Sequence, residues 1–331
     1  MTADQTSDNG QLMSRAFWVT GPGQGAVMDT PVGAGSESSV LVRALYSGVS
    51  RGTESLVFHG QVPEGEYERM RAPFQEGRFP FPVKYGYASV GEVVQGCDAL
   101  LGRRVFCLFP HQALYAVPEQ AVVALPDDLP AGRAVLAANM ETAINGLWDA
   151  APAVGDRIAV VGLGVVGLLT AWLASRIPGT RVTALDVNPG RRAVADALGL
   201  RFATACDRDD HDLVIHASGQ GAGLATALAL AGQEARVVEM SWYGDQAVTV
   251  PLGGAFHSRR LTLRSSQVGQ IRPSRQPRWT HRDRLSLALS LLRDDRLDAL
   301  ITGESAFDDM PEALGSVLTD GRDTLCHRIH Y

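Results

Sequence analysis

The pattern of apolar and polar residues divides the chain into parts of different character. Residues 15–130 contain short apolar runs that Gly and Pro interrupt about every ten residues, which is typical of a β-rich domain. Residues 131–150 have helical spacing. Residues 157–268 alternate between apolar strands and helices, and this repetition predicts a parallel, doubly wound sheet. A basic linker at 271–280 precedes an amphipathic helix, a second helix and a terminal strand.

We therefore predict an α/β protein with two domains, as the length of 331 residues also favours. The expected segments are a β-rich catalytic domain in 1–128, a dinucleotide-binding domain in 129–270 and a return segment in 271–331. Residues 1–14 are polar and lack an apolar signal core, so we expect a disordered tail there.

Composition and charge narrow the class of protein. Hydrophobic content of 45% and charged content of 20% are those of a soluble globular chain. The net charge of −6 argues against a nucleic-acid binder, which needs a basic face. The four cysteines form no C-x-x-C pair, and a reducing, cytoplasmic setting is the expectation. The uncharged run 158–174 is shorter than the roughly 20 residues of a membrane helix, so we expect no membrane span.

A glycine motif indicates a dinucleotide site. Gly162, Gly164 and Gly167 form G-x-G-x-x-G, which here follows a predicted strand and opens a predicted helix. The first Gly allows a tight turn, the second lets a pyrophosphate approach, and the third lets helix and strand pack closely. The residues expected to contact the cofactor at this turn are Gly162, Leu163, Gly164, Val165, Val166 and Gly167.

The ends of the following strands complete the predicted cofactor site. Asp186 ends the next strand, where a carboxylate accepts hydrogen bonds from the adenosine ribose and repels a 2′-phosphate, so NAD is favoured over NADP. Arg191, with Arg192 beside it, is an alternative partner for that phosphate. Two later strand ends are expected beneath the cofactor, and they contribute Ala217, Ser218 and Ser241. Beside them, Trp242 and Tyr243 are either an apolar wall for a flat substrate or packing at the sheet edge.

The order of these parts resembles the medium-chain dehydrogenase/reductase superfamily over residues 15–331. The resemblance rests on "GVSRGTESLVFHG" at 48–60, "PVKYGYASVGEVV" at 82–94 and "LDALITGESAFDDMPEAL" at 297–314. It implies a GroES-like catalytic domain, a Rossmann domain and a homodimer. The β-rich run "QAVTVPL" at 246–252 is an expected sheet edge for such a dimer.

The zinc positions of that superfamily are changed in this chain. Ser50 or Arg51 stands at the cysteine ligand, Tyr87 at the histidine and Ala88 at the glutamate, while Glu141 falls near the remaining ligand. Because a catalytic zinc usually needs three protein ligands, we expect no metal. "SGVSRGTES", "KYGYASVG" and "ANMETAINGLWDA" resemble a zinc-less subgroup that contains a bacteriochlorophyllide dehydrogenase. That likeness implies NAD-dependent chemistry on a secondary alcohol or ketone.

Without zinc, a side chain must handle the hydroxyl proton. We expect Tyr87 to donate to a carbonyl oxygen, unless it only packs in a turn. Glu141 serves as a base if burial raises its pKa, and is otherwise an exposed first-turn carboxylate. The other candidates for the proton path or for substrate orientation are His111, Ser50, Thr53, His59 and Lys84. Of these five, His59 is more typical of a structural role. Glu54, which is not among them, is expected to hold its loop together.

Three functions fit the sequence. The first is a zinc-independent, NAD-dependent oxidoreductase that interconverts a secondary alcohol and a ketone on a small molecule. The second is an NADPH-dependent quinone or enoyl reductase, against which Asp186 argues. The third is a non-catalytic NAD-binding redox sensor, which would leave the polar residues at 48–60 without a purpose. The arginines at 271–284 are a solvated linker or a guide for an anionic substrate.

Overall fold

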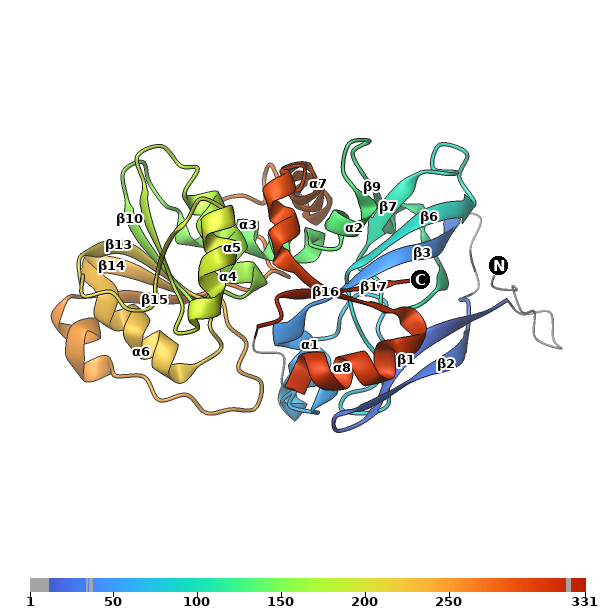
Figure 1. Ribbon diagram of the computed structural model, residues 1–331, viewed down its shortest axis with the longest axis horizontal. Helices are drawn as coiled ribbons and strands as arrows, with labels where there is room; N and C mark the ends of the chain where they lie inside the picture. Colours follow the sequence, from blue (N-terminus) through green and yellow to red (C-terminus); the bar gives the residue numbers. More distant parts are fainter. Residues whose placement is uncertain (1–11, 34, 36–37, 320–322) are drawn as a thin grey trace. The chain divides into compact units, whose positions relative to one another are not determined.

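The computed structural model describes residues 12–33, 35, 38–319 and 323–331, which form two compact units (Figure 1). The described residues of Met1–Ala138, Leu289–Arg293 and Ile301–Tyr331 make unit 1, and Asn139–Ala288 with Asp294–Leu300 make unit 2. The units thus divide ten residues later than the predicted boundary after residue 128, and 271–288 and 294–300 of the predicted return segment belong to unit 2. Of the predicted tail, 1–11 lies outside the described residues, whereas 13 and 14 begin a strand.

Unit 1 contains two sheets within the described residues. The smaller one is antiparallel, in the order β2-β1-β5-β4. Its strands are β1 (Met13–Gly21), β2 (Gln24–Pro31), β4 (Glu76–Gly77) and β5 (Val83–Lys84). The larger sheet follows the order β16-β17-β3-β6-β7-β9, with β8 also paired to β3. Its strands are β3 (Ser39–Val49), β6 (Ser89–Gln95), β7 (Arg104–Cys107), β8 (Leu114–Pro118), β9 (Val122–Ala124), β16 (Ile301–Ala306) and β17 (Cys326–His330).

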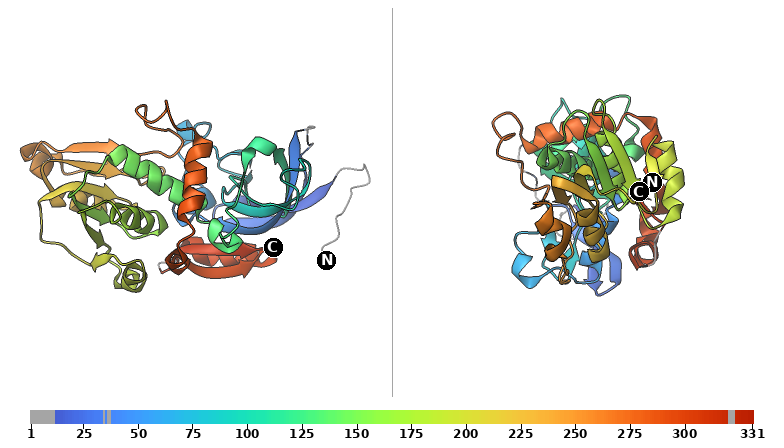
Figure 2. Two further views of the ribbon diagram at one scale, coloured as in Figure 1. Left: turned by 90° about the horizontal axis from the view of Figure 1, so that it is seen from above. Right: turned by 90° about the vertical axis from the view of Figure 1, so that its left-hand side faces the viewer.

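The core of unit 1 follows from alternation along these strands. In β3, Val40 and Val42 are fully buried, and they pack with Val105 and Tyr115 from neighbouring strands. The first view of Figure 2 shows the strands of this unit curving. Three helices accompany the sheets, namely α1 (Arg51–Phe58), α2 (Ala131–Ala134) and α8 (Met310–Thr319). The β-rich front predicted from the sequence is confirmed.

Unit 2 is built on a parallel sheet in the order β12-β11-β10-β13-β14-β15. Its strands are β10 (Arg157–Val161), β11 (Arg181–Leu185), β12 (Arg201–Ala203), β13 (His211–His216), β14 (Ala231–Glu239) and β15 (Thr262–Ser265). The helices are α3 (Ala137–Ala150), α4 (Val165–Ala174), α5 (Arg192–Ala197), α6 (Gly221–Leu230) and α7 (His281–Leu291). The first two residues of α3 and the last three of α7 are assigned to unit 1.

The strand order of unit 2 reverses direction at one place, between β10 and β13. The chain runs outward from β10 through β11 to β12, then returns to β13 and runs the other way. Because crossovers between parallel strands are right-handed, α4 and α5 cover one face of the sheet and α6 covers the other. Ligands bind such sheets at the carboxyl ends of the strands, where the direction reverses. The predicted doubly wound sheet is confirmed.

The predicted sheet edge at 246–252 is wrong. Residues 246–251 have no strand pairing, and Leu252–Phe256 forms a short π-helical turn. Among the described residues, the outermost strand on this side is β15. The β-branched residues of this run predicted a strand, but Pro251 lacks an amide donor and the run is half-exposed, so it gains little from pairing.

Within the described part of the chain, every helix is too short or too polar to cross a membrane.

Candidate active site

The glycine turn has the geometry that each glycine was predicted to provide. Gly162 has φ of +96°, and a Cβ there would lie 2.5 Å from the Ser218 backbone. A Cβ on Gly167 would lie 1.9 Å from the Gly162 carbonyl oxygen, so strand and helix meet too closely for a side chain. Gly164 is exposed, with no atom within 4 Å of its ideal Cβ. The turn is therefore open only where a phosphate would approach the backbone.

The start of α4 provides partial positive charge that would attract an anion. Gly164 is its N-cap and offers no side-chain acceptor, and Val165 and Val166 form the first turn. The amides at a helix start have no acceptor within the helix, and the helix dipole places partial positive charge there. A pyrophosphate fits such a position.

Asp186 stands at the end of β11 and is tied to the same turn. Its Oδ2 accepts from the Leu163 amide at 2.7 Å, and its Oδ1 accepts from the Asn188 amide at 2.8 Å. The carboxylate is thus fixed next to the glycines. Of the two arginines considered for a 2′-phosphate, Arg191 is buried, and the Arg192 guanidinium lies over the Phe202 ring at 4.7 Å.

A second set of polar groups lies at the carboxyl ends of β13 and β14. We call His216, Ser218, Glu239, Ser241 and Tyr243 the carboxyl-edge cluster. His216 Nε2 lies 2.5 Å from Ser218 Oγ, and its Nδ1 lies 2.7 Å from Glu239 Oε2. The Tyr243 hydroxyl also donates to Glu239 Oε2, at 2.9 Å. Ser241 donates its amide to Glu239 Oε1 at 2.7 Å, and its Oγ accepts from the Gly219 amide.

The predicted residues Ala217, Ser218 and Ser241 lie at this edge, and His216 and Glu239 lie there in addition, although the sequence had not indicated them. The signal available was their position, because each is the last residue of a parallel strand. Burial opposes ionisation of Glu239, but hydrogen bonds from His216 and Ser241 outweigh it and hold the pKa of the carboxyl below its usual value. The Tyr243 hydroxyl donates a hydrogen bond to Glu239, so this side chain has a polar role in addition to any apolar contact.

In unit 1, the segment 48–60 forms helix α1 and brings several predicted residues together. We call Ser50, Thr53 and Tyr87 the hydroxyl cluster, since the Tyr87 phenol is hydrogen-bonded to the side chains of the other two. Burial, and then the charge of Glu54, raise the pKa of Tyr87 to about 12, while the two hydrogen bonds oppose this shift. Tyr87 therefore stays protonated at neutral pH.

Glu54 and His111 form a buried pair beside the hydroxyl cluster. Glu54 Oε1 accepts from the Ser50 amide at 2.7 Å, which fixes the start of α1. Its Oε2 lies 3.0 Å from His111 Nε2, and both side chains are at most 6% exposed. His111, which the sequence alone could equally have placed on the surface, is therefore a buried residue. Glu54 and His111 also line a cavity of about 10 Å³, which is the size of one water molecule.

His111 continues the chain of hydrogen bonds to two residues that sequence reasoning missed. Its Nδ1 lies 2.7 Å from Ser47 Oγ, which lies 2.9 Å from the Tyr331 hydroxyl. Ser47 belongs to β3 and Tyr331 follows β17, so their positions in the sequence, 284 residues apart, carry no signal of this contact. Burial raises the pKa of Tyr331, so this hydroxyl also keeps its proton.

The side chains at and beside the positions where the resemblance implies zinc ligands do not fit a zinc ion. Tyr87 is a protonated phenol hydrogen-bonded to hydroxyls, Ala88 has no donor atom, and Glu54 is committed to Ser50 and His111. Within the described ranges, no three His, Cys, Asp or Glu side chains are grouped so that they could hold a metal ion. Zinc prefers Cys, His or carboxylate ligands in a tetrahedral arrangement, which this set does not supply.

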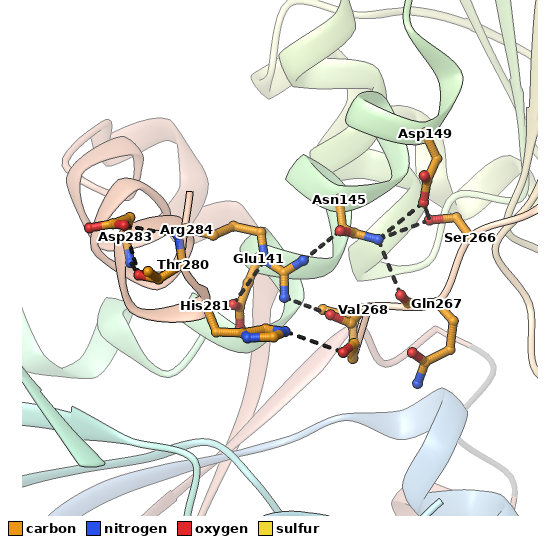
Figure 3. A network of polar contacts seen from close by, with 11 residues as sticks. Glu141, Asn145, Asp149, Ser266, Gln267, Val268, Thr280, His281, Asp283 and Arg284 are labelled. Carbon is orange, nitrogen blue, oxygen red and sulfur yellow. Dashed lines mark hydrogen bonds and ion pairs between the residues drawn. The ribbon is translucent and has the colours of Figure 1, made fainter. Parts of the chain in front are cut away.

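Glu141 lies in unit 2, in a buried network with α7 (Figure 3). Its Oε1 accepts from Arg284 Nε at 3.0 Å, and the two side chains are 6% and 1% exposed. Arg284 also donates to Asn145 Oδ1 and to the Val268 carbonyl. Asn145 in turn donates to Asp149. The alternative of an exposed first-turn carboxylate is therefore wrong.

Burial raises the pKa of Glu141, and Arg284 opposes the shift. The burial expected of a base is thus present, but the carboxylate is already held by a guanidinium. This network also explains why 271–288 belongs to unit 2, since Arg284 of α7 is bonded to residues of α3.

The remaining candidates have other partners. His59 follows the last turn of α1, and its Nδ1 lies 2.8 Å from the Ser55 carbonyl oxygen. Lys84 is fully buried and donates to Glu76 and Gln112. Burial lowers the pKa of Lys84, and Glu76 opposes this. Neither is bonded to the hydroxyl cluster by any contact that we find in the described chain.

Comparison with known proteins gives relatives among the dehydrogenases, although no family model matches the chain. An L-threonine 3-dehydrogenase of Chelativorans is 28% identical over 125 residues, which is 38% of this chain and 36% of the relative. The (R,R)-butanediol dehydrogenase of Bacillus subtilis is 23% identical over 279 residues, covering 72% of this chain and 78% of the relative. The chain thus matches only about a third of the first relative's length.

The fold is shared with solved alcohol dehydrogenases. One from Escherichia coli CFT073, solved in complex with NADH, aligns with a TM-score of 0.77 and 16% identity over 96% of this chain and 99% of its own. These comparisons confirm a GroES-like domain with a Rossmann domain and support the resemblance to the medium-chain dehydrogenase/reductase superfamily.

Proposed function

We propose that this chain is a zinc-independent, NAD-dependent oxidoreductase that interconverts a secondary alcohol and a ketone. The observation that carries the proposal is the hydroxyl cluster, because Tyr87, a protonated phenol, and Ser50 stand at positions where the resemblance implies zinc ligands, and Thr53 is hydrogen-bonded to the same phenol. The dehydrogenase relatives support the general reaction. The zinc independence is supported by the changed ligand residues and by the sequence likeness to a zinc-less subgroup.

The residues of unit 2 fit a dinucleotide. The amides of the glycine turn and of the start of α4 hold the pyrophosphate, and Asp186 accepts from the adenosine ribose. Bound NAD supplies the hydride acceptor. Asp186 repels a 2′-phosphate, and Arg192 is turned to Phe202, so NAD is the preferred form.

The residues of unit 1 handle the proton. Tyr87 donates a hydrogen bond to the carbonyl oxygen of the ketone, and Ser50 and Thr53 hold the phenol in place. A phenol with a pKa of about 12 is a poor base at neutral pH, so it works as a donor. The Glu54–His111 pair places a titratable group beside it.

The substrate is a small molecule with a secondary alcohol beside a flat group. This part of the proposal rests on the likeness to the bacteriochlorophyllide dehydrogenase subgroup, whose namesake oxidises a hydroxyethyl side chain to an acetyl group. Tyr87 contacts the Tyr85 ring edge to face, and Tyr85 contacts Phe79, so two aromatic rings follow one another on one side of the phenol.

The test is a panel of turnover assays with the full chain. We expect NAD-dependent oxidation of 1-phenylethanol or a related 1-hydroxyethyl arene, and slower turnover with NADP. Reduction of quinones or enones with NADPH alone would instead favour the second function considered above. Binding of NAD without turnover of any of these substrates would favour a redox sensor.

A further inference from the structure

The carboxyl-edge cluster contains a histidine and a carboxylate that the proposed reaction does not use. His216 is fully buried, and its two ring nitrogens face Ser218 Oγ and Glu239 Oε2. Glu239 accepts two further hydrogen bonds, from the Tyr243 hydroxyl and from the Ser241 amide. An ionised Glu239 can accept the hydrogen bonds from His216, Tyr243 and Ser241 together. The charge of the cluster therefore depends on whether the His216 ring carries one proton or two.

The strand order places this cluster next to the proposed cofactor site. Asp186 follows β11, the glycine turn follows β10, and the cluster follows β13 and β14, which lie on the other side of β10. The Ser218 backbone is in contact with Gly162 of the turn. A dinucleotide with its adenosine at Asp186 and its pyrophosphate at the turn extends its second half toward β13 and β14. The inference therefore rests on the proposed function.

Few other ionisable groups act on this edge. Helix α6 has no titratable side chain. In β10 the only one is Arg157, which lies at the opposite, amino end and is paired with Asp210. In β15, Arg264 is paired with Asp149. Asp245 is exposed on the following loop.

Tyr243 keeps its proton, because burial and the neighbouring Glu239 raise its pKa. The protonation of His216 therefore decides whether the cluster carries a net charge of about −1 or about 0.

We propose that the His216–Glu239 pair sets the preference of this chain for oxidised over reduced cofactor, with the proton on His216 as the switch. The oxidised nicotinamide ring carries a positive charge that the reduced ring lacks. With neutral His216, the charge of Glu239 is uncompensated and attracts the oxidised ring. With protonated His216, that attraction is cancelled. By linkage, binding of the oxidised form favours release of the proton, and the reduced form does not.

The same proton turns the Ser218 hydroxyl. Neutral Nε2 accepts from Ser218, whose oxygen accepts from the Gln220 amide at 3.2 Å and keeps one lone pair for a donor on the ligand. Protonated Nε2 donates to Ser218, whose hydrogen then points elsewhere. The switch thus changes both the charge and the hydrogen-bonding pattern at one place.

The experiment measures the dissociation constants of NAD⁺ and NADH by calorimetry, from about pH 5 to about pH 9 at constant ionic strength. In the wild type, we expect the affinity for NAD⁺ relative to NADH to rise about tenfold with pH. Glu239→Gln should remove most of this pH dependence by weakening NAD⁺ binding. The matched control is Glu234→Gln on the same strand, where the exposed carboxylate pairs with Arg260, and it should behave as wild type.

A second measurement is made on the wild type and does not depend on Glu239→Gln. Histidine-selective NMR follows the titration of His216, assigned by comparison with Tyr243→Phe, whose side chain contacts the pair. We expect NAD⁺ to move the titration midpoint to lower pH by about one unit relative to NADH. Equal midpoints, or a ratio of affinities that does not change with pH, would overturn this inference alone. If neither dinucleotide binds, the proposed function fails with it.

Discussion

At the scale of single residues, the account depends on what Tyr87 does with its proton. Tyr87 occupies a position where the resemblance implies a metal ligand. Its side chain does more than fill space, because the phenol is hydrogen-bonded to Ser50 and Thr53 and the charge of Glu54 acts on its pKa. Burial keeps it neutral far above physiological pH. A neutral donor held by two hydroxyls is suited to stabilise charge that develops on a substrate oxygen.

Replacing Tyr87 by Phe removes this donor and little volume. General acid–base groups contribute about 10²–10⁴-fold, so kcat should fall by at least about tenfold while the dissociation constant of NAD stays within about twofold. Tyr85→Phe, two residues away, is the matched control and should keep kcat. Steady-state kinetics and a cofactor titration check both. An effect on KM alone would reduce Tyr87 to a substrate-positioning residue.

Asp186 controls the choice of cofactor at the same scale. Asp186→Asn keeps the shape and an acceptor oxygen but removes the charge that repels a 2′-phosphate. The preference for NAD over NADP, which we expect to be about ten- to a hundredfold in the wild type, should shrink toward parity. The measurement is titration of both cofactors, with exposed Asp196→Asn as control. An unchanged preference would show that another group selects the cofactor.

At the scale of elements, one buried ion pair joins α3 and α7. Arg284 is almost fully buried, and its guanidinium is bonded to Glu141, Asn145 and the Val268 carbonyl. Removing one partner of such a pair leaves an uncompensated charge, which is more costly than the pair itself is favourable. The two helices are far apart in sequence, so the pair is a main determinant of where α7 packs in unit 2.

Glu141→Gln should therefore lower the free energy of unfolding by about 3 kcal/mol. Urea denaturation with an unchanged m-value would measure it. Glu312→Gln, at an exposed site in the first turn of α8, is the comparison and should change stability by less than about 1 kcal/mol. A stable Glu141→Gln protein with reduced kcat would instead support the role of Glu141 as a base.

Elements with a strong local pattern could be predicted from the sequence. The apolar run of β10 and the glycines after it identified the strand, the turn and α4, because each glycine answers to a local steric demand. Ser47 and Tyr331 could not be found, since their contact with His111 depends on strand pairing across the larger sheet. The partner of Glu141 could not be found either, because Arg284 is 143 residues away and lies in a run of arginines that is typical of a solvated linker.

At the scale of the whole molecule, we predict a homodimer, as the resemblance implies. The interface should involve β15, the edge strand of the unit 2 sheet in the described chain on the side opposite β12, rather than residues 246–252. An open strand edge offers unpaired backbone groups to a second copy. Light scattering should give twice the mass of 35.4 kDa at micromolar concentration, and Leu263→Pro should shift it toward the monomer. A monomer mass for the wild type would refute the dimer.

The central claim is that the chain moves a hydride and a proton without zinc. The most direct test is one sample of the full chain, purified without chelators, in which zinc per chain is counted by elemental analysis and NAD-dependent turnover is then measured before and after exposure to a strong chelator. The hydroxyl cluster predicts far less than one zinc per chain, about 0.1 or below, and a kcat that the chelator leaves unchanged, because no three suitable ligands meet among the described residues. One zinc per chain, with turnover lost on chelation and restored by added zinc, would contradict the account.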